Sequence, residues 1–132
     1  NISMPIYYTV TERPNPLKPT EPAKFYATAK ALKKTELDEI AKDIARGSTT
    51  VSEADVRAVL VELADQIAGR IAGGETVHLG NLGYFRATLK SRGAETAKEV
   101  TSASIEDVRV RFIPGKDLEG QLNSAEFKKA DS

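Results

Sequence analysis

Five basic residues on two predicted strands are the strongest candidates for binding chemistry in this sequence. Residues 84–92 alternate between apolar and polar positions, and residues 108–112 do the same. The five residues are Arg86, Lys90, Arg92, Arg109 and Arg111. If the two strands pair antiparallel, the alternation allows all five to share one face of a sheet. Such a face could neutralise phosphates and release counterions, which would give salt-sensitive affinity for nucleic acid. The alternative is an exposed basic face that only keeps the sheet soluble.

Further basic and aromatic residues lie near the start of the chain. The basic ones are Lys24, Lys30, Lys33 and Lys34, and the aromatic ones are Tyr7, Tyr8, Phe25 and Tyr26. The lysines could extend a basic patch, but a solvated face is the favoured interpretation. The aromatic residues could stack on bases, although aromatic side chains on strands usually pack on their neighbours.

Little in the sequence supports an enzyme. The chain contains no cysteine, which excludes a cysteine nucleophile, a thiolate metal site and a disulfide framework. His78 is the single histidine, and a metal site normally needs several such ligands. Asp38 and Glu39 are adjacent, so they do not converge as a general acid and base would. We therefore expect no catalytic residue, metal, cofactor or small-molecule substrate.

Composition indicates one folded domain with an uneven distribution of charge. The 132 residues include 40% hydrophobic and 29% charged residues, with 19 basic and 19 acidic side chains. Residues 1–35 carry six basic and two acidic residues, residues 36–79 four and nine, and residues 80–132 nine and eight. This supports an anionic partner only weakly, since dedicated nucleic-acid binders usually have a pI above about 9. No apolar run approaches the roughly 18 residues of a membrane span, so a cytoplasmic location without membrane contact is expected.

Two strands joined by a proline-rich connector are predicted at the N-terminus. Residues 6–11 are β-branched and aromatic. In residues 24–31, Phe25 and three alanines alternate with the more polar Lys24, Tyr26, Thr28 and Lys30. Four prolines lie between the two segments and exclude a helix or a central strand there. Met4 is expected to be the native start, so residues 1–3 are left out of the expected fold.

Two amphipathic helices are predicted next. Thr35 is expected to cap the first helix, which Gly47 ends, and Ser52 is expected to cap the second. The second helix carries an apolar stripe over about five turns. The stripe consists of Val56, Val59, Leu60, Leu63, Ile67 and Ile71. Because it is wide for a pair of helices alone, we expect it to pack on a sheet or on a second subunit.

Residues 73–85 organise the chain, because a helix ends there and a hairpin begins. Gly73 and Gly74 can end the helix, and Gly80 and Gly83 bracket a tight turn. Residues 93–105 are mostly small and polar, which predicts a mobile arm or loop.

A third strand and a short helix are predicted near the C-terminus. Val108, Val110 and Phe112 are expected to form a buried strand face, and Pro114 with Gly115 breaks that strand. A short helix is expected over residues 116–122, followed by a fraying tail.

This order of elements resembles the bacterial histone-like HU/IHF family. The matching residues are Thr35-Glu36-Leu37, Gly74 to Leu79, Leu82-Gly83-Tyr84-Phe85, Phe112, Gly115-Lys116 and Leu118. The resemblance covers about residues 34–123. The N-terminal strands and the Arg13-Pro14-Asn15-Pro16 segment resemble an HU-like subgroup that carries such an extension.

The resemblance implies an intertwined homodimer in which helices form a base and sheets form a saddle. Two β-arms then reach around the DNA minor groove, where the family's arm-tip proline kinks the duplex. Here the arm is shorter and lacks proline, and residues 93–100 carry two glutamates against one lysine, Lys98. Lys98 and Lys116 join the expected DNA contacts. The expected dimer core consists of Phe85, Phe112, Leu82, Leu63 and Ile67.

The sequence thus predicts an α+β, HU/IHF-like dimer with an N-terminal β extension. The expected divisions are an extension over residues 4–33, a DNA-binding domain over 34–123 and a flexible tail over 124–132. The expected function is that of an architectural protein of the nucleoid, which binds duplex DNA with little sequence specificity. The alternative is a dimeric interaction or assembly module that keeps this fold but has lost DNA binding.

Overall fold

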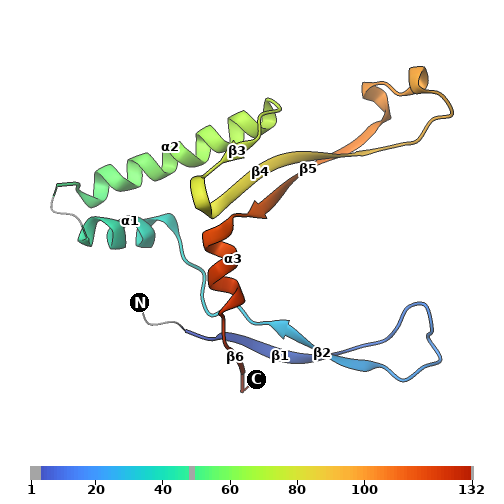
Figure 1. Cartoon of the computed structure of the whole chain (residues 1–132), viewed down its shortest axis with the longest axis horizontal. Helices are drawn as coiled ribbons and strands as arrows, with labels where there is room; N and C mark the ends of the chain where they lie inside the picture. Colours follow the sequence, from blue (N-terminus) through green and yellow to red (C-terminus); the bar gives the residue numbers. More distant parts are fainter. Residues whose placement is uncertain (1–3, 48–49, 132) are drawn as a thin grey trace. The chain divides into compact units, whose positions relative to one another are not determined.

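The protein is a mixed α+β chain that divides into two compact units. The computed structural model describes residues 4–47 and 50–131, so residues 1–3, left out of the expected fold, lie outside the described part. The terminal unit contains residues up to 35 together with those from 121 onward, and the central unit contains residues 36–120. Figure 1 shows the order of the elements along the chain.

The terminal unit is built on a three-stranded sheet. Strands β1 (Ile6–Arg13) and β2 (Lys24–Ala29) pair antiparallel, from Tyr8 opposite Ala29 to Arg13 opposite Lys24. The prolines lie in the connector between them, so both predicted strands and their connector are confirmed, although β2 ends two residues earlier than predicted.

The prediction of a fraying tail is wrong for strand β6 (Phe127–Lys129). This strand pairs parallel with β1, with Ile6 opposite Phe127, which gives the sheet order β2-β1-β6. The free edge of β1 presents unpaired backbone N–H and C=O groups, and the tail satisfies them. The Ile6 N–H, for example, donates to the Glu126 carbonyl oxygen at 2.8 Å.

Helices α1 (Leu37–Arg46) and α2 (Glu53–Ala72) pack against each other in the central unit, where Ala41 and Val56 are buried. The predicted cap at Ser52 is confirmed, since its Oγ accepts a hydrogen bond from the Asp55 N–H at 3.1 Å. The predicted cap at Thr35 is wrong, because the N-cap is the next residue, Glu36, and α1 begins at Leu37. Acidic residues in the first turn favour this helix start without a side-chain cap.

The second sheet has the order β3-β4-β5, and all its pairs are antiparallel. Its strands are β3 (Val77–His78), β4 (Gly83–Ser91) and β5 (Ile105–Pro114). The predicted turn between β3 and β4 is confirmed as a short 3₁₀ turn, Gly80–Leu82. Gly83 follows with φ of +145°, and a Cβ there would lie 2.4 Å from the Ile113 carbonyl oxygen. Glycine is therefore required where β4 starts.

Between β4 and β5 the chain forms the predicted arm. Two short 3₁₀ turns, Ala97–Glu99 and Ser102–Ser104, lie within it. After β5, helix α3 (Lys116–Asn123) confirms the predicted short helix. None of the helices in the described part of the chain combines the length and the apolar character needed to span a bilayer.

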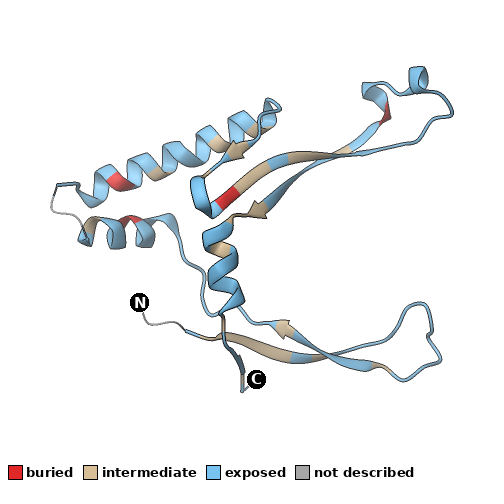
Figure 2. Ribbon diagram, in the orientation of Figure 1, coloured by how far each residue is buried: buried red, intermediate tan, exposed pale blue. Residues whose placement is uncertain are grey.

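Most of the ribbon is coloured as exposed or intermediate in Figure 2, and the exposed residues include many large apolar side chains. The predicted burial of the β5 face is wrong for this single chain, since Val108 is 61% exposed and Val110 59% exposed. The α2 stripe is also only partly covered, with Val59 65% exposed. The accessible surface is 11060 Å², whereas two separate compact units of these sizes would expose about 8,000 Å² in all.

Candidate functional site

The register of the β4–β5 pair gathers four of the five predicted basic residues on one face. Arg86 lies opposite Arg111, Thr88 opposite Arg109, and Lys90 opposite Asp107. Residues directly opposite each other in an antiparallel pair project to the same side of the sheet. We call this side the basic face. The predicted clustering of Arg86, Lys90, Arg109 and Arg111 is thus present, and all four residues are exposed.

Two like charges meet at the centre of the basic face. Arg86 and Arg111 are exposed cross-strand neighbours, and neither forms an ion pair with any residue in the described part of the chain. Like charges directly opposite each other destabilise a sheet by a fraction of a kcal/mol. An anion between the two guanidinium groups would remove this repulsion, and guanidinium groups suit phosphate oxygens.

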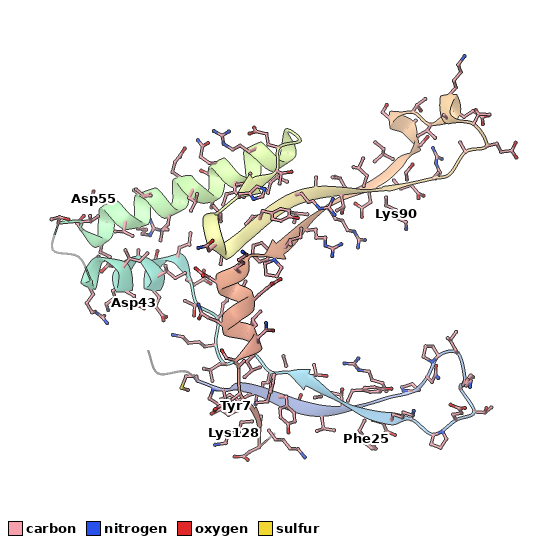
Figure 3. The ribbon with its side chains drawn as sticks, in the orientation of Figure 1. Tyr7, Phe25, Asp43, Asp55, Lys90 and Lys128 are labelled. Atoms are coloured by element: carbon pink, nitrogen blue, oxygen red, sulfur yellow. The ribbon has the colours of Figure 1, made fainter. Side chains whose placement is uncertain are left out.

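One acidic residue interrupts the basic face. The Arg109 Nε donates to Asp107 Oδ2 at 2.7 Å, so Arg109 is already partly neutralised. Asp107 is also the cross-strand partner of Lys90, whose position on β4 is labelled in Figure 3. The arm end of the face therefore attracts anions less strongly than the Arg86–Arg111 pair does.

The remaining predicted basic residues lie away from the basic face. The β4–β5 register shifts between Lys90 and Ser91, which interrupts the alternation before Arg92. Arg92 lies just beyond β4, and its Nη2 donates to the Ala103 carbonyl oxygen at 2.6 Å within the arm. Lys98 lies in a 3₁₀ turn of the arm, and Lys116 is the first residue of α3.

His78 extends the basic face on the β3 side. It is the cross-strand partner of Tyr84, and the two rings stack with centroids 4.5 Å apart and an interplanar angle of 15°. Tyr84 lies two residues before Arg86 on β4, and His78 lies beside it on β3, so the aromatic pair continues the basic face onto β3. The described residues contain no group of three or more His, Cys, Asp or Glu side chains that could hold a metal ion.

The opposite side of the same sheet is apolar and faces α2. Phe85 and Phe112 are cross-strand partners whose ring centroids lie 4.9 Å apart. An open groove of about 790 Å³ lies between this face and the C-terminal half of α2. Its apolar lining includes Ala64, Ile67, Ala68, Ile71, Phe85, Ala87, Leu89, Val108 and Val110. We call it the apolar groove.

The five residues predicted for a dimer core are not buried within the single chain. Phe112 is 36% exposed, Leu63 39% and Leu82 48%, while Phe85 and Ile67 are half-buried. Phe85 and Ile67 line the apolar groove directly.

The terminal sheet brings together basic residues that lie far apart in the sequence. Lys24 and Lys30 lie on and just after β2, while Lys128 lies on β6. Lys128 is absent from the residues predicted to bind, because Phe127–Lys129 is too short to predict as a strand. Its only sequence signal is one aromatic residue followed by two lysines.

Comparison with known proteins identifies the fold and the family. The family model described as "HU domain fused to wHTH, Ig, or Glycine-rich motif" (HU-HIG) matches residues 4–129. No curated protein matches the chain.

Fourteen chains in solved structures are similar to this chain, and two of them illustrate the shared fold. A putative DNA-binding protein from Bacteroides vulgatus is similar at a TM-score of 0.63 and 12% identity, over 94% of this chain and 47% of its own. The present chain therefore spans about half the length of that protein. Anabaena HU, crystallised with DNA, is similar at a TM-score of 0.53 and 18% identity, over 68% of this chain and 99% of its own. The chain thus has an HU-like fold, and since the family model matches nearly all of its length, it belongs to the HU-HIG family.

Proposed function

We propose that this chain is a non-enzymatic, histone-like architectural protein that binds duplex DNA with little sequence specificity. The observation that carries the proposal is the unpaired arginine pair, Arg86 opposite Arg111, on the exposed side of an HU-like sheet. Because Anabaena HU was crystallised with DNA, the same fold is known to accept this ligand.

The basic face would supply phosphate contacts rather than base readout. Arg86 and Arg111 form its centre, with Arg109 and Lys90 toward the arm. Guanidinium groups bind phosphate oxygens in a bidentate manner, and each phosphate that is neutralised releases counterions. Arg92, Lys98 and Lys116 are proposed as additional contacts outside the face. Such contacts position a duplex without specifying its sequence.

We propose that the arm approaches the minor groove without a proline wedge. Residues 92–104 contain no proline, so the arm lacks the rigid apolar group that would unstack a base step. Any bending of the duplex would then follow from phosphate neutralisation and from the deformability of the sequence.

The proposed assembly is a homodimer closed through the apolar groove. The groove is lined almost wholly by apolar side chains, and two of its lining residues on β5, Val108 and Val110, are more than half exposed in one chain. A second copy would offer an identical apolar face, which satisfies the self-complementarity that a two-fold interface requires. Phe85, Phe112, Leu82, Leu63 and Ile67 are the proposed core of this dimer.

We propose that the chain divides by function as its sequence predicts. Residues 34–123 would act as the DNA-binding domain and residues 4–33 as an extension, with the bacterial nucleoid in the cytoplasm as the place of action.

A second candidate function is a dimeric interaction or assembly module without DNA binding. The zero net charge and the Arg109–Asp107 ion pair favour it, because both reduce the attraction for a polyanion.

Fluorescence anisotropy of a labelled mixed-sequence duplex of about 30 base pairs, titrated at several salt concentrations, separates the two candidates. Binding that weakens steeply with salt, and equally for a second unrelated duplex, supports the architectural function. A wild-type protein that does not bind at low salt contradicts it and leaves the interaction module.

A further inference from the structure

The structure concentrates positive charge in the terminal unit. Residues 1–35 and 121–132 carry eight basic and four acidic residues, a net charge of +4. Residues 36–120 carry eleven basic and fifteen acidic residues, a net charge of −4. The neutral total therefore conceals a basic unit. Residues 1–35 supply its net charge, and the C-terminal residues that pair with β1 add two lysines and two acidic residues.

One side of the terminal sheet carries a large part of this charge. On β1 and β2, Arg13 lies opposite Lys24, and Tyr26 lies opposite Thr11. On β6, Lys128 lies opposite Tyr7. Alternation along β1 puts Tyr7, Thr11 and Arg13 on the same side of the sheet. We call this side the polar face.

Side-chain contacts confirm this arrangement. Arg13 Nη2 donates to the Thr28 Oγ1 at 3.1 Å, and its guanidinium lies over the Tyr26 ring at 5.5 Å from the centroid. Thr11 Oγ1 and Thr28 Oγ1 lie 3.1 Å apart. Arg13 is therefore held by neutral groups, and its charge is not compensated by them.

The strand positions on the polar face carry no acidic side chain, because Glu12 alternates to the other side with Val10. Within residues 4–47 and 50–131, neither Lys24 nor Lys128 forms an ion pair. Both lysines are exposed. Figure 3 labels Lys128 and Tyr7, which come from neighbouring strands.

A hollow of about 400 Å³ lies at the β6 end of the sheet. Tyr7, Lys30, Lys128 and Lys129 line it, together with the acidic residue Asp131. Three lysine residues and one acidic residue thus line this hollow, and Lys128, opposite Tyr7, belongs to the polar face.

We propose that the polar face of the terminal sheet is a second surface for duplex DNA, with Arg13, Lys24 and Lys128 contacting backbone phosphates. The proposal rests on the DNA-binding function proposed above. Tyr7 and Arg13 are six residues apart on β1, a span of about 20 Å. Phosphates along one DNA strand advance by about 3.4 Å per nucleotide, so the face spans about six of them.

The chemistry of the face suits a phosphate backbone. Cations lie at both ends of the sheet, and threonine hydroxyls and tyrosines lie between them. Hydroxyl, guanidinium and ammonium donors are the groups that proteins commonly place on phosphate oxygens. The competing occupant is the acidic helical part of a second copy, since the central unit carries the opposite charge.

The test compares Lys24→Glu/Lys128→Glu with a matched control, Lys18→Glu/Lys42→Glu. Both variants change the net charge equally, but Lys18 lies in the connector and Lys42 on α1. Anisotropy titrations of the 30-base-pair duplex with the full chain, repeated at several salt concentrations, give the slope of log K for DNA binding against log salt concentration. Loss of two phosphate contacts would lower the slope by about 1.8. At a fixed moderate salt concentration we expect about tenfold weaker binding by the first variant, and a smaller change in the control.

The outcomes separate the two proposals. If wild-type protein binds DNA and the two variants have equal slopes, the second surface is wrong while the proposed function stands. If wild-type protein does not bind, both proposals fail. Charge reversal could perturb the sheet, so a Lys24→Gln/Lys128→Gln variant serves as a second test. Half the loss of affinity in this variant supports the proposal. Sedimentation of DNA-free protein tests the competing occupant, a second copy of the chain. If only the Lys24/Lys128 variants lose self-association, and their salt slope is unchanged, the proposal is overturned in favour of a second copy.

Discussion

Arg86 and Arg111 lie directly opposite each other on neighbouring antiparallel strands, with both side chains exposed on one side of the sheet. A sheet selected for stability alone would place opposite charges or a neutral pair at these positions, because like charges across strands repel. The pair therefore has a cost in the free protein, and binding of an anion would remove it.

Replacing Arg86 with glutamine should change stability and binding in opposite directions. Relief of the repulsion should raise the free energy of unfolding by about 0.2–1 kcal/mol. Loss of one phosphate contact should lower the slope of log K against log salt by about 0.9. Urea unfolding and anisotropy measure the two effects, and Lys42→Gln on α1 is the control. A variant that is stabilised but binds DNA with an unchanged slope would remove the arginine pair from the interface.

Replacing Asp107 with asparagine should strengthen DNA binding. Arg109 donates to Asp107 in the free protein, so the change releases this guanidinium and also removes a negative charge from the basic face. The salt slope should rise by about 0.9 if Arg109 gains a phosphate. Asp65→Asn on α2 removes the same charge elsewhere and separates local from general electrostatics. Equal effects of the two variants would show that Arg109 makes no new contact.

Replacing Val110 with aspartate should abolish the proposed dimer. The new carboxylate would lie in the apolar groove, where burial against a second copy would leave it unpaired. Light scattering after size-exclusion chromatography should show a dimer for the wild-type protein and a monomer for the variant. Thr88→Asp introduces the same charge on the basic face and should leave the dimer intact. A dimeric Val110→Asp protein would contradict assembly through this groove.

Replacing Gly83 with alanine should destabilise the central unit by about 2–4 kcal/mol. The new Cβ would meet the Ile113 carbonyl oxygen at 2.4 Å and the Phe112 ring at 2.6 Å, at a backbone φ of +145°. Gly69→Ala is the control, because Gly69 lies within α2 and its new methyl group would have no neighbour within 4 Å. This control should stabilise the helix by about 1 kcal/mol. Chemical denaturation measures both changes, and equal stability of the two variants would argue against the close approach at Gly83.

Local chemistry in the sequence was sufficient for most of the elements. Ser52 caps α2 because its hydroxyl meets the orphan N–H groups of the first turn, whatever the rest of the chain does. Gly83 and Pro114 mark the ends of strands for equally local reasons, since each restricts or frees the backbone at its own position. The alternation in β4 and β5 likewise predicted the basic face that their register then produced.

Other features depend on pairing between distant residues. Phe127–Lys129 becomes a strand only because the edge of β1 is available, and three residues carry too little pattern to reveal that partner. The shift between Lys90 and Ser91 displaces Arg92 from the alternation, and the Asp107–Arg109 ion pair weakens the basic face.

By itself the sequence determined the type and order of the elements, the likeness to the HU fold and the amphipathic character of the central sheet. Those properties follow from side-chain periodicity, helix caps and glycine positions, each of which acts within a few residues. Only the tertiary structure decided which cations meet, which are neutralised, and that Lys128 joins the N-terminal sheet. These properties depend on strand register and on contacts between residues up to about 120 positions apart, which local pattern does not encode.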